Sequence, residues 1–135
     1  MQTSVYEQDY HTYHLNLLRD MTRQIAQQYP FIGDDCPQDD REFIALLQQL
    51  GESTKDSEFL IKGQDLLCKI VSAYAHLMPL VYRDLFWFFG GDCLHYMPDE
   101  EIAIFQNLDE QRHDAEAQQL PFSYKDARAK TMGIL

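Results

Sequence analysis

The stretch LIKGQDLLCKIVSAYAHLMPLVYRDLFWFF (residues 60–89) decides the fold class, because it carries the longest helical pattern in the chain. Apolar residues and one glycine recur there every three or four positions, which is the spacing of one face of an α-helix. They are Leu60, Gly63, Leu67, Ile70, Tyr74, Leu77, Val81, Leu85 and Phe88. The pattern predicts a long central helix. Pro79 should kink or interrupt it, since proline removes a backbone donor and crowds the preceding turn.

Two helical patterns precede this stretch. In the first, residues 4–29, Ser4 can cap a helix while Glu7 reaches back to form a capping box. The second is the brief apolar pattern of residues 41–50, and Gly51 follows it in the position that commonly ends a helix.

Two further patterns follow the central stretch. Pro98 suits the first position of a helix that runs to Gln118 or Gln119, and Ser123 can cap a last short helix. No segment alternates apolar and polar residues as a strand would. We therefore predict one all-α domain over residues 1–135: a bundle of about five helices with a long, Pro-kinked central helix.

The charge of the chain restricts its partners. The formal net charge is −11, so DNA, RNA and anionic lipid surfaces would be repelled, and direct nucleic-acid binding is not expected. A basic protein partner is favoured. Two other interpretations stay open: the charge only keeps the protein soluble, or the acidic surface mimics nucleic acid and occupies a DNA- or RNA-binding partner.

The cysteines and the first residues indicate a compartment. The three cysteines lie far apart without a CxxC pair, which does not resemble a disulfide framework. The first residues carry no basic region followed by an apolar run, and charged residues interrupt the long apolar stretch. We therefore expect no secretory signal, no membrane span and a cytoplasmic location.

The aromatic end of the central helix is the strongest functional signal in the sequence. At about 100° per residue, Phe86 and Trp87 lie off the apolar face, so this end is apolar all round and must be covered or offered to a partner. Aromatic residues dominate binding hot spots. We predict a partner-binding patch of Phe86, Trp87, Phe89 and Tyr96. The alternative is that the C-terminal segment covers this end with Leu120, Phe122, Tyr124, Ile134 and Leu135.

Two groups of residues could carry chemistry, both with unspecific spacing. Cys93 and His95 could bind a metal or act as a nucleophile and its base. Glu7, His11 and His14 stand at helical spacing along the flank of one face and could share a metal. A buried cysteine, a capping histidine and a solvated charged face are the competing interpretations, and we predict no cofactor.

These observations lead to a functional prediction. The chain contains no GxGxxG, GxxxxGK[ST], GxSxG or HExxH motif, which removes the common dinucleotide, P-loop, hydrolase and zinc-protease interpretations. We predict a small acidic helical protein-interaction protein, an adaptor, regulatory or accessory factor without catalytic chemistry. The alternatives are a metal-dependent or thiol enzyme that uses the two groups above, and the nucleic-acid mimic. Self-association into a homodimer through the aromatic patch is left open.

Overall fold

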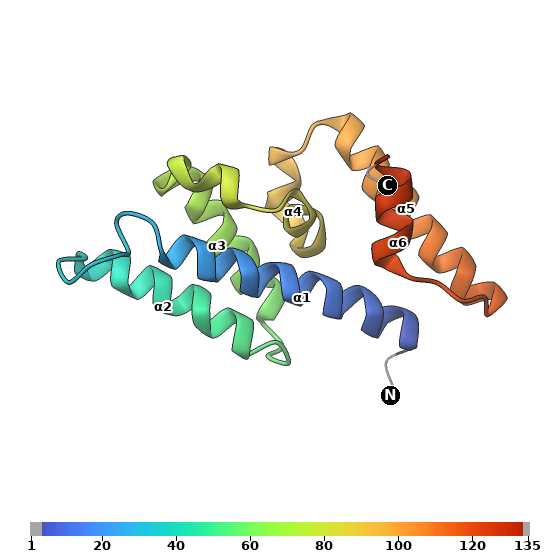
Figure 1. The fold of residues 1–135 in the computed structure, drawn as a ribbon, viewed down its shortest axis with the longest axis horizontal. Coiled ribbons are helices and arrows are strands. Elements are labelled where there is room, and N and C mark those ends of the chain that lie inside the picture. Colours follow the sequence, from blue (N-terminus) through green and yellow to red (C-terminus); the bar gives the residue numbers. More distant parts are fainter. Residues whose placement is uncertain (1–3, 134–135) are drawn as a thin grey trace.

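The computed structural model describes residues 4–133, and all regular structure in that range is helical (Figure 1). Six α-helices and two 3₁₀ helices follow one another along the chain. They are α1 (Val5–Ala26), α2 (Gln38–Glu52), α3 (Phe59–Ala73), η1 (Ala75–Leu80), α4 (Arg83–Phe89), η2 (Gly91–Tyr96), α5 (Asp99–Gln118) and α6 (Tyr124–Thr131). The all-α prediction is confirmed for the described residues, although the helices outnumber the expected five.

The first helix, α1, runs along the longest axis of the molecule and contacts elements at both ends of the protein. Its C-terminal half packs beside α2 and close to η1, whereas its N-terminal half contacts α4 and α6 (Figure 1). Helices α5 and α6 pair at the end opposite to the loop that joins α1 to α2. Helix α1 therefore contacts both regions, which also meet directly where α3 packs against α4 and η2.

Local sequence signals set several helix ends. The Ser4 hydroxyl accepts a hydrogen bond from the Glu7 backbone N–H at 3.1 Å, and the Ser123 hydroxyl accepts one from the Asp126 N–H at 3.3 Å. Each side chain satisfies one of the backbone donors that a helix leaves unpaired in its first turn. The end of α5 is closed by Gln119 in the left-handed conformation. Both predicted serine caps are thus present.

The predicted long central helix is instead three separate elements, α3, η1 and α4. Helix α3 ends at Ala73, and Pro79 lies inside η1 near its end. The proline ring would collide with the carbonyl of the residue four positions earlier, Ala75, if the α-helix continued. Tighter 3₁₀ bonds replace the α-helical ones, as from the Leu77 N–H to the Tyr74 carbonyl at 2.9 Å. A single kinked helix is therefore not confirmed. The helix is interrupted before and around Pro79, which was the other outcome expected of this proline.

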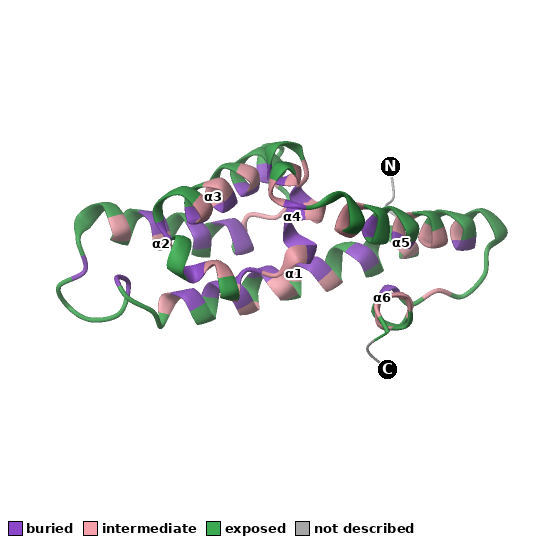
Figure 2. Cartoon of the chain, turned by 90° about the horizontal axis from the view of Figure 1, so that it is seen from above, coloured by how far each residue is buried: buried purple, intermediate pink, exposed green. Residues whose placement is uncertain are grey.

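One hydrophobic core runs through all of these elements. Each of α1 to α5 contributes a leucine that is at most 1% exposed, and Tyr124 of α6 is buried as deeply. The leucines are Leu18, Leu47, Leu67, Leu85 and Leu108. Buried stripes face inward along the paired helices while the outer faces are exposed (Figure 2). No helix among residues 4–133 is both long and apolar enough to cross a membrane.

Candidate functional site

The predicted aromatic patch is mostly inside the protein. Phe86 is fully buried and Phe89 is 3% exposed, while Trp87 and Tyr96 are half-buried. The expectation of an exposed patch is therefore wrong for Phe86 and Phe89, whose rings belong to the core.

The cover over the aromatic residues comes from segments that the sequence did not suggest. Phe86 packs against Tyr96 of η2, with ring centroids 5.6 Å apart, and Trp87 stacks on Phe105 of α5 at 6.1 Å. The Trp87 indole N–H also donates to the Asp109 carboxylate at 3.1 Å. Helix α5 and η2, rather than the chain end, thus cover these side chains.

Of the C-terminal residues proposed as cover, Tyr124 is fully buried, Phe122 is half-buried and Leu120 is 51% exposed. Ile134 and Leu135 lie outside the described residues. Tyr124 packs on Tyr10 and His14 of α1, with ring centroids 5.0 and 5.2 Å apart, and not on the aromatic residues of α4.

The weak metal candidates on α1 are separated by burial. Glu7 and His11 are exposed, whereas His14 is fully buried with its Nδ1 2.8 Å from the Tyr10 carbonyl oxygen. Within residues 4–133 no group of three or more His, Cys, Asp or Glu side chains is arranged to hold a metal ion.

The thiol candidate is also divided between core and surface. Cys93 is fully buried and its thiol lies 3.8 Å from the Gln64 carbonyl oxygen, while His95 is exposed. Burial raises the pKa of the Cys93 thiol to about 12. Because the thiolate is the reactive form, this cysteine is an unreactive core residue near neutral pH.

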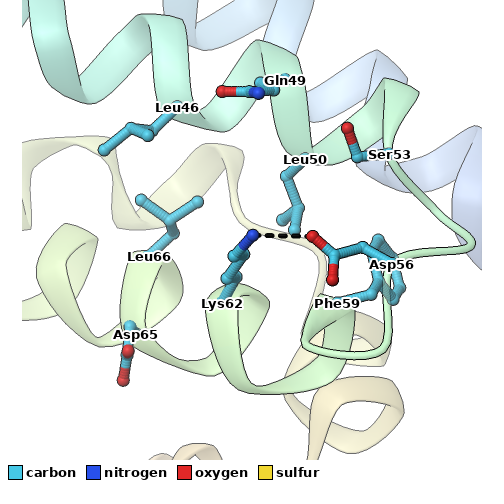
Figure 3. A pocket seen from close by; sticks show the side chains of 9 residues that line it. All are labelled: Leu46, Gln49, Leu50, Ser53, Asp56, Phe59, Lys62, Asp65 and Leu66. Atoms are coloured by element: carbon cyan, nitrogen blue, oxygen red, sulfur yellow. Dashed lines mark hydrogen bonds and ion pairs between the residues drawn. The ribbon is translucent and has the colours of Figure 1, made fainter.

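A surface groove lies between α2 and α3 (Figure 3). It encloses about 240 Å³, and its lining is mainly apolar. Leu46 and Leu50 of α2 approach it from one side, and Phe59 and Leu66 of α3 from the other. Leu46 is 53% exposed although other apolar side chains lie beside it, so the groove offers contiguous apolar surface to solvent.

The charges beside this groove are unevenly paired. The Lys62 ammonium lies 2.7 Å from Asp56 and 3.9 Å from Glu58, so two carboxylates share one cation. The hydrogen bond from Lys62 lowers the pKa of the Asp56 carboxyl, and the same bond raises the pKa of Lys62. In Figure 3 this ion pair spans one end of the groove while Leu46 and Leu66 face each other at the other end. The rim is therefore acidic and the floor apolar.

A buried polar cluster occupies the other end of the molecule, where α1, α4, α5 and α6 meet. Asp84 is 1% exposed and accepts two hydrogen bonds from Arg128, at 2.6 and 2.9 Å. Beside this pair, His14 Nε2 and the Tyr124 hydroxyl are buried without a hydrogen-bond partner among the described residues. Burial lowers the pKa of the His14 imidazole to about 4, so His14 is neutral at pH 7.

The comparison with protein families covers nearly the whole chain. A family model described as PA2817-like matches residues 6–134. The chain belongs to the PA2817-like family. No curated protein and no solved structure matches it. The groove and the polar cluster of this PA2817-like chain both lie within the matched residues.

Sequence reasoning missed the groove, although one signal for it was present. On α2 the buried stripe consists of Phe43, Leu47 and Leu50, and Leu46 lies on its flank. Leu66 of α3 lies in the same way beside the stripe of Phe59 and Leu67. An apolar residue just outside a buried stripe is a sign of a second apolar surface.

Proposed function

We propose that this chain is a protein-interaction domain without catalytic chemistry, which holds the apolar face of a basic amphipathic helix in the groove between α2 and α3. The observation that carries the proposal is an apolar groove, open at the surface, that leaves Leu46 53% exposed. Solvent-exposed apolar surface of this kind is costly unless a partner covers it.

The size of the groove favours a protein side chain over a metabolite. Small-molecule pockets usually enclose roughly 300–1,000 Å³ and bury most of their ligand. The groove, at about 240 Å³, is smaller and suits one or two apolar side chains of a larger partner. Two neighbouring helices with an apolar furrow between them are the usual receptor for an amphipathic helix, whose anchors recur at three- and four-residue steps.

The charges beside the groove determine which amphipathic helices are expected to bind. Asp56 and Glu58 share the single ammonium of Lys62, and the whole chain carries a net charge of −11. Lysine or arginine residues beside the apolar anchors would be attracted to this rim, whereas acidic residues would be repelled. A basic partner is therefore expected to associate faster and to depend on ionic strength.

The test uses a model peptide, because charge and apolar pattern define the expected occupant. A helical peptide of leucine and lysine, with the leucines on one face, is titrated into the full chain and followed by amide chemical shifts in NMR. Binding should shift the amides around Leu46, Leu50 and Leu66. The same peptide with glutamate in place of lysine should bind at least about tenfold more weakly, because like charges then face each other.

A pair of matched variants separates groove binding from general attraction. Leu46→Glu places a charge in the groove and should weaken the peptide about tenfold or more. Leu120→Glu adds the same charge to a leucine of similar exposure, 51%, outside the groove, and should leave binding within about twofold. Equal effects of the two variants, or shifts away from α2 and α3, would overturn the proposal. A homodimer that Leu46→Glu dissociates would assign the groove to a second copy instead.

A further inference from the structure

We propose that a second pocket, formed by α1, α3, α4 and α5, binds a small organic monocarboxylate that carries a flat apolar group. The pocket is an open depression of about 350 Å³, a volume within the range of small-molecule sites. Tyr10 of α1, Leu60 of α3, Phe88 of α4 and Arg112 of α5 line it. This site does not depend on the groove between α2 and α3.

Arg112 is the feature that indicates an anion. Its side chain is 11% exposed, and the centre of its guanidinium lies 4.0 Å from the centroid of the Tyr10 ring, which holds it in place. Its one hydrogen bond within residues 4–133 is a long contact of 3.4 Å to Asp109. The Nε atom of Arg112 is buried with no partner there. Asp109 in turn uses its other oxygen to accept from Trp87 at 3.1 Å.

Arg128 shows what a fully paired arginine looks like in this protein. It donates through Nε and Nη2 to both oxygens of Asp84, at 2.6 and 2.9 Å. Such forked pairing is the usual arrangement for a guanidinium that has left water, since burying a cation without strong partners is costly. Arg112 has the less exposed side chain of the two, 11% against 24%, but lacks that arrangement. A carboxylate in the pocket would pair with the part of the Arg112 guanidinium that lines it.

The rest of the lining defines what accompanies the carboxylate. The Phe88 ring contacts the rings of Tyr10 and His11, with centroid distances of 5.8 and 5.5 Å, and Leu60 adds an aliphatic surface. Flat apolar groups pack well on such rings. Glu7 also lines the pocket, and with the acidic chain it opposes anions of higher charge. The chemistry therefore favours an arylacetate-like monocarboxylate over a phosphate.

The test titrates phenylacetate into the full chain and follows amide shifts by NMR. Shifts should centre on Phe88 and Arg112, and benzyl alcohol, which lacks the carboxylate, should bind about tenfold or more weakly because it loses the charged hydrogen bonds. Inorganic phosphate should not compete. Equal binding of benzyl alcohol, or displacement of phenylacetate by phosphate at matched ionic strength, would overturn the proposal.

Two pairs of variants locate the site. Leu60→Glu puts a negative charge into the pocket and should weaken phenylacetate about tenfold. Ile61→Glu makes the same change at the next residue, which is 60% exposed and does not line the pocket, and should have less than about a twofold effect.

The second pair tests the cation itself. Arg112→Gln should abolish binding. Arg23→Gln removes an arginine that also pairs with an aspartate three residues earlier but is 78% exposed, and it should leave binding unchanged. Circular dichroism shows whether Arg112→Gln folds. If this variant does not fold, the comparison of Leu60→Glu with Ile61→Glu tests whether phenylacetate binds in this pocket. Equal binding by Leu60→Glu and Ile61→Glu would exclude this pocket.

Discussion

The two halves of α1 pack against opposite kinds of interior. Toward its C-terminus, fully buried Met21 and Ile25 join Leu47 of α2 in a mainly apolar interior. Toward its N-terminus, equally buried His14 lies among Tyr124, Asp84 and their partners, an interior of aromatic rings and polar groups. One helix therefore spans an apolar region and a polar region of a single core.

This difference indicates which interactions stabilise each region and what kind of binding surface each region can offer. Apolar burial is non-directional, so the α2 and α3 region tolerates a surface groove that continues the chemistry of its core. The α5 and α6 region depends on a small number of directional pairs, such as Asp84 with Arg128, and these depend on protonation and geometry. We therefore expect the two regions to respond differently to charge changes and to pH.

The largest expected effect comes from breaking the buried ion pair. Asp84→Ala leaves the Arg128 guanidinium, 24% exposed, without its carboxylate and should lower the free energy of unfolding by about 3–5 kcal/mol. Urea unfolding followed by circular dichroism measures the loss. Because Arg128 lies on α6, limited proteolysis should also cleave α6 faster in this variant.

The control for Asp84→Ala is a matching substitution in the exposed ion pair of the apolar region. Asp56→Ala removes the nearer of the two carboxylate partners of Lys62, whose side chain is 53% exposed. The effect should be much smaller than that of Asp84→Ala, because solvent screens this pair and Glu58 remains beside Lys62. Similar losses for Asp84→Ala and Asp56→Ala would remove the distinction between the two regions.

The second prediction concerns acid. His14 has a folded pKa of about 4, below the ordinary value of 6.5, because burial disfavours its charged form. The unfolded chain therefore binds more protons between these two pH values. The part of the stability that depends on neutral His14 is fully present above about pH 6.5 and is lost as the pH falls toward 4. The expected loss from this group is about 3 kcal/mol.

Two variants test the assignment to His14. Urea unfolding between pH 7 and 4 should show a shallower pH dependence for His14→Gln than for the wild type. Leu18→Ala, one turn further along α1 in the core, should lower stability by about 2–5 kcal/mol at every pH and leave the slope unchanged. A wild-type slope in His14→Gln would assign the acid sensitivity to other groups.

Much of the fold was predictable because it depends on local signals. Three- and four-residue spacing indicated the helices, and Ser4 and Ser123 marked two of their starts. The central segment was mispredicted because its apolar period continues across Pro79, although the backbone cannot remain α-helical there. Side-chain pattern and backbone constraint conflicted at that point, and the backbone constraint prevailed.

The candidate sites were less predictable, because they depend on contacts between distant segments. Phe86 and Trp87 lie off the apolar stripe, but whether they are exposed depends on Tyr96 and Phe105, which the period of α4 cannot reveal. Likewise, the pairing of Arg128 with Asp84 joins residues 44 positions apart. Spacing identifies a face of a helix, whereas a site requires knowledge of what covers that face.

The smallest expected effect lies at the junction between the two regions, where α3 meets α4. A Cβ at Gly63 would overlap the ring of Phe89, so Gly63→Ala should force the helices apart and cost about 1–3 kcal/mol despite the better helix propensity of alanine. At Gly51, on α2, an added Cβ would meet only the Arg19 side chain at 3.5 Å, an ordinary contact. Gly51→Ala should therefore stabilise the protein by up to about 1 kcal/mol.

Thermal unfolding of the two glycine variants measures how tightly the regions are joined. The melting temperature should fall for Gly63→Ala and rise slightly for Gly51→Ala, with both transitions remaining single because one core connects the helices. Two separate transitions in Gly63→Ala would show that the apolar and polar regions unfold independently once this contact is lost. An unchanged melting temperature would mean that Phe89 moves aside freely, which its 3% exposure and its packing on Phe59 at 5.3 Å oppose.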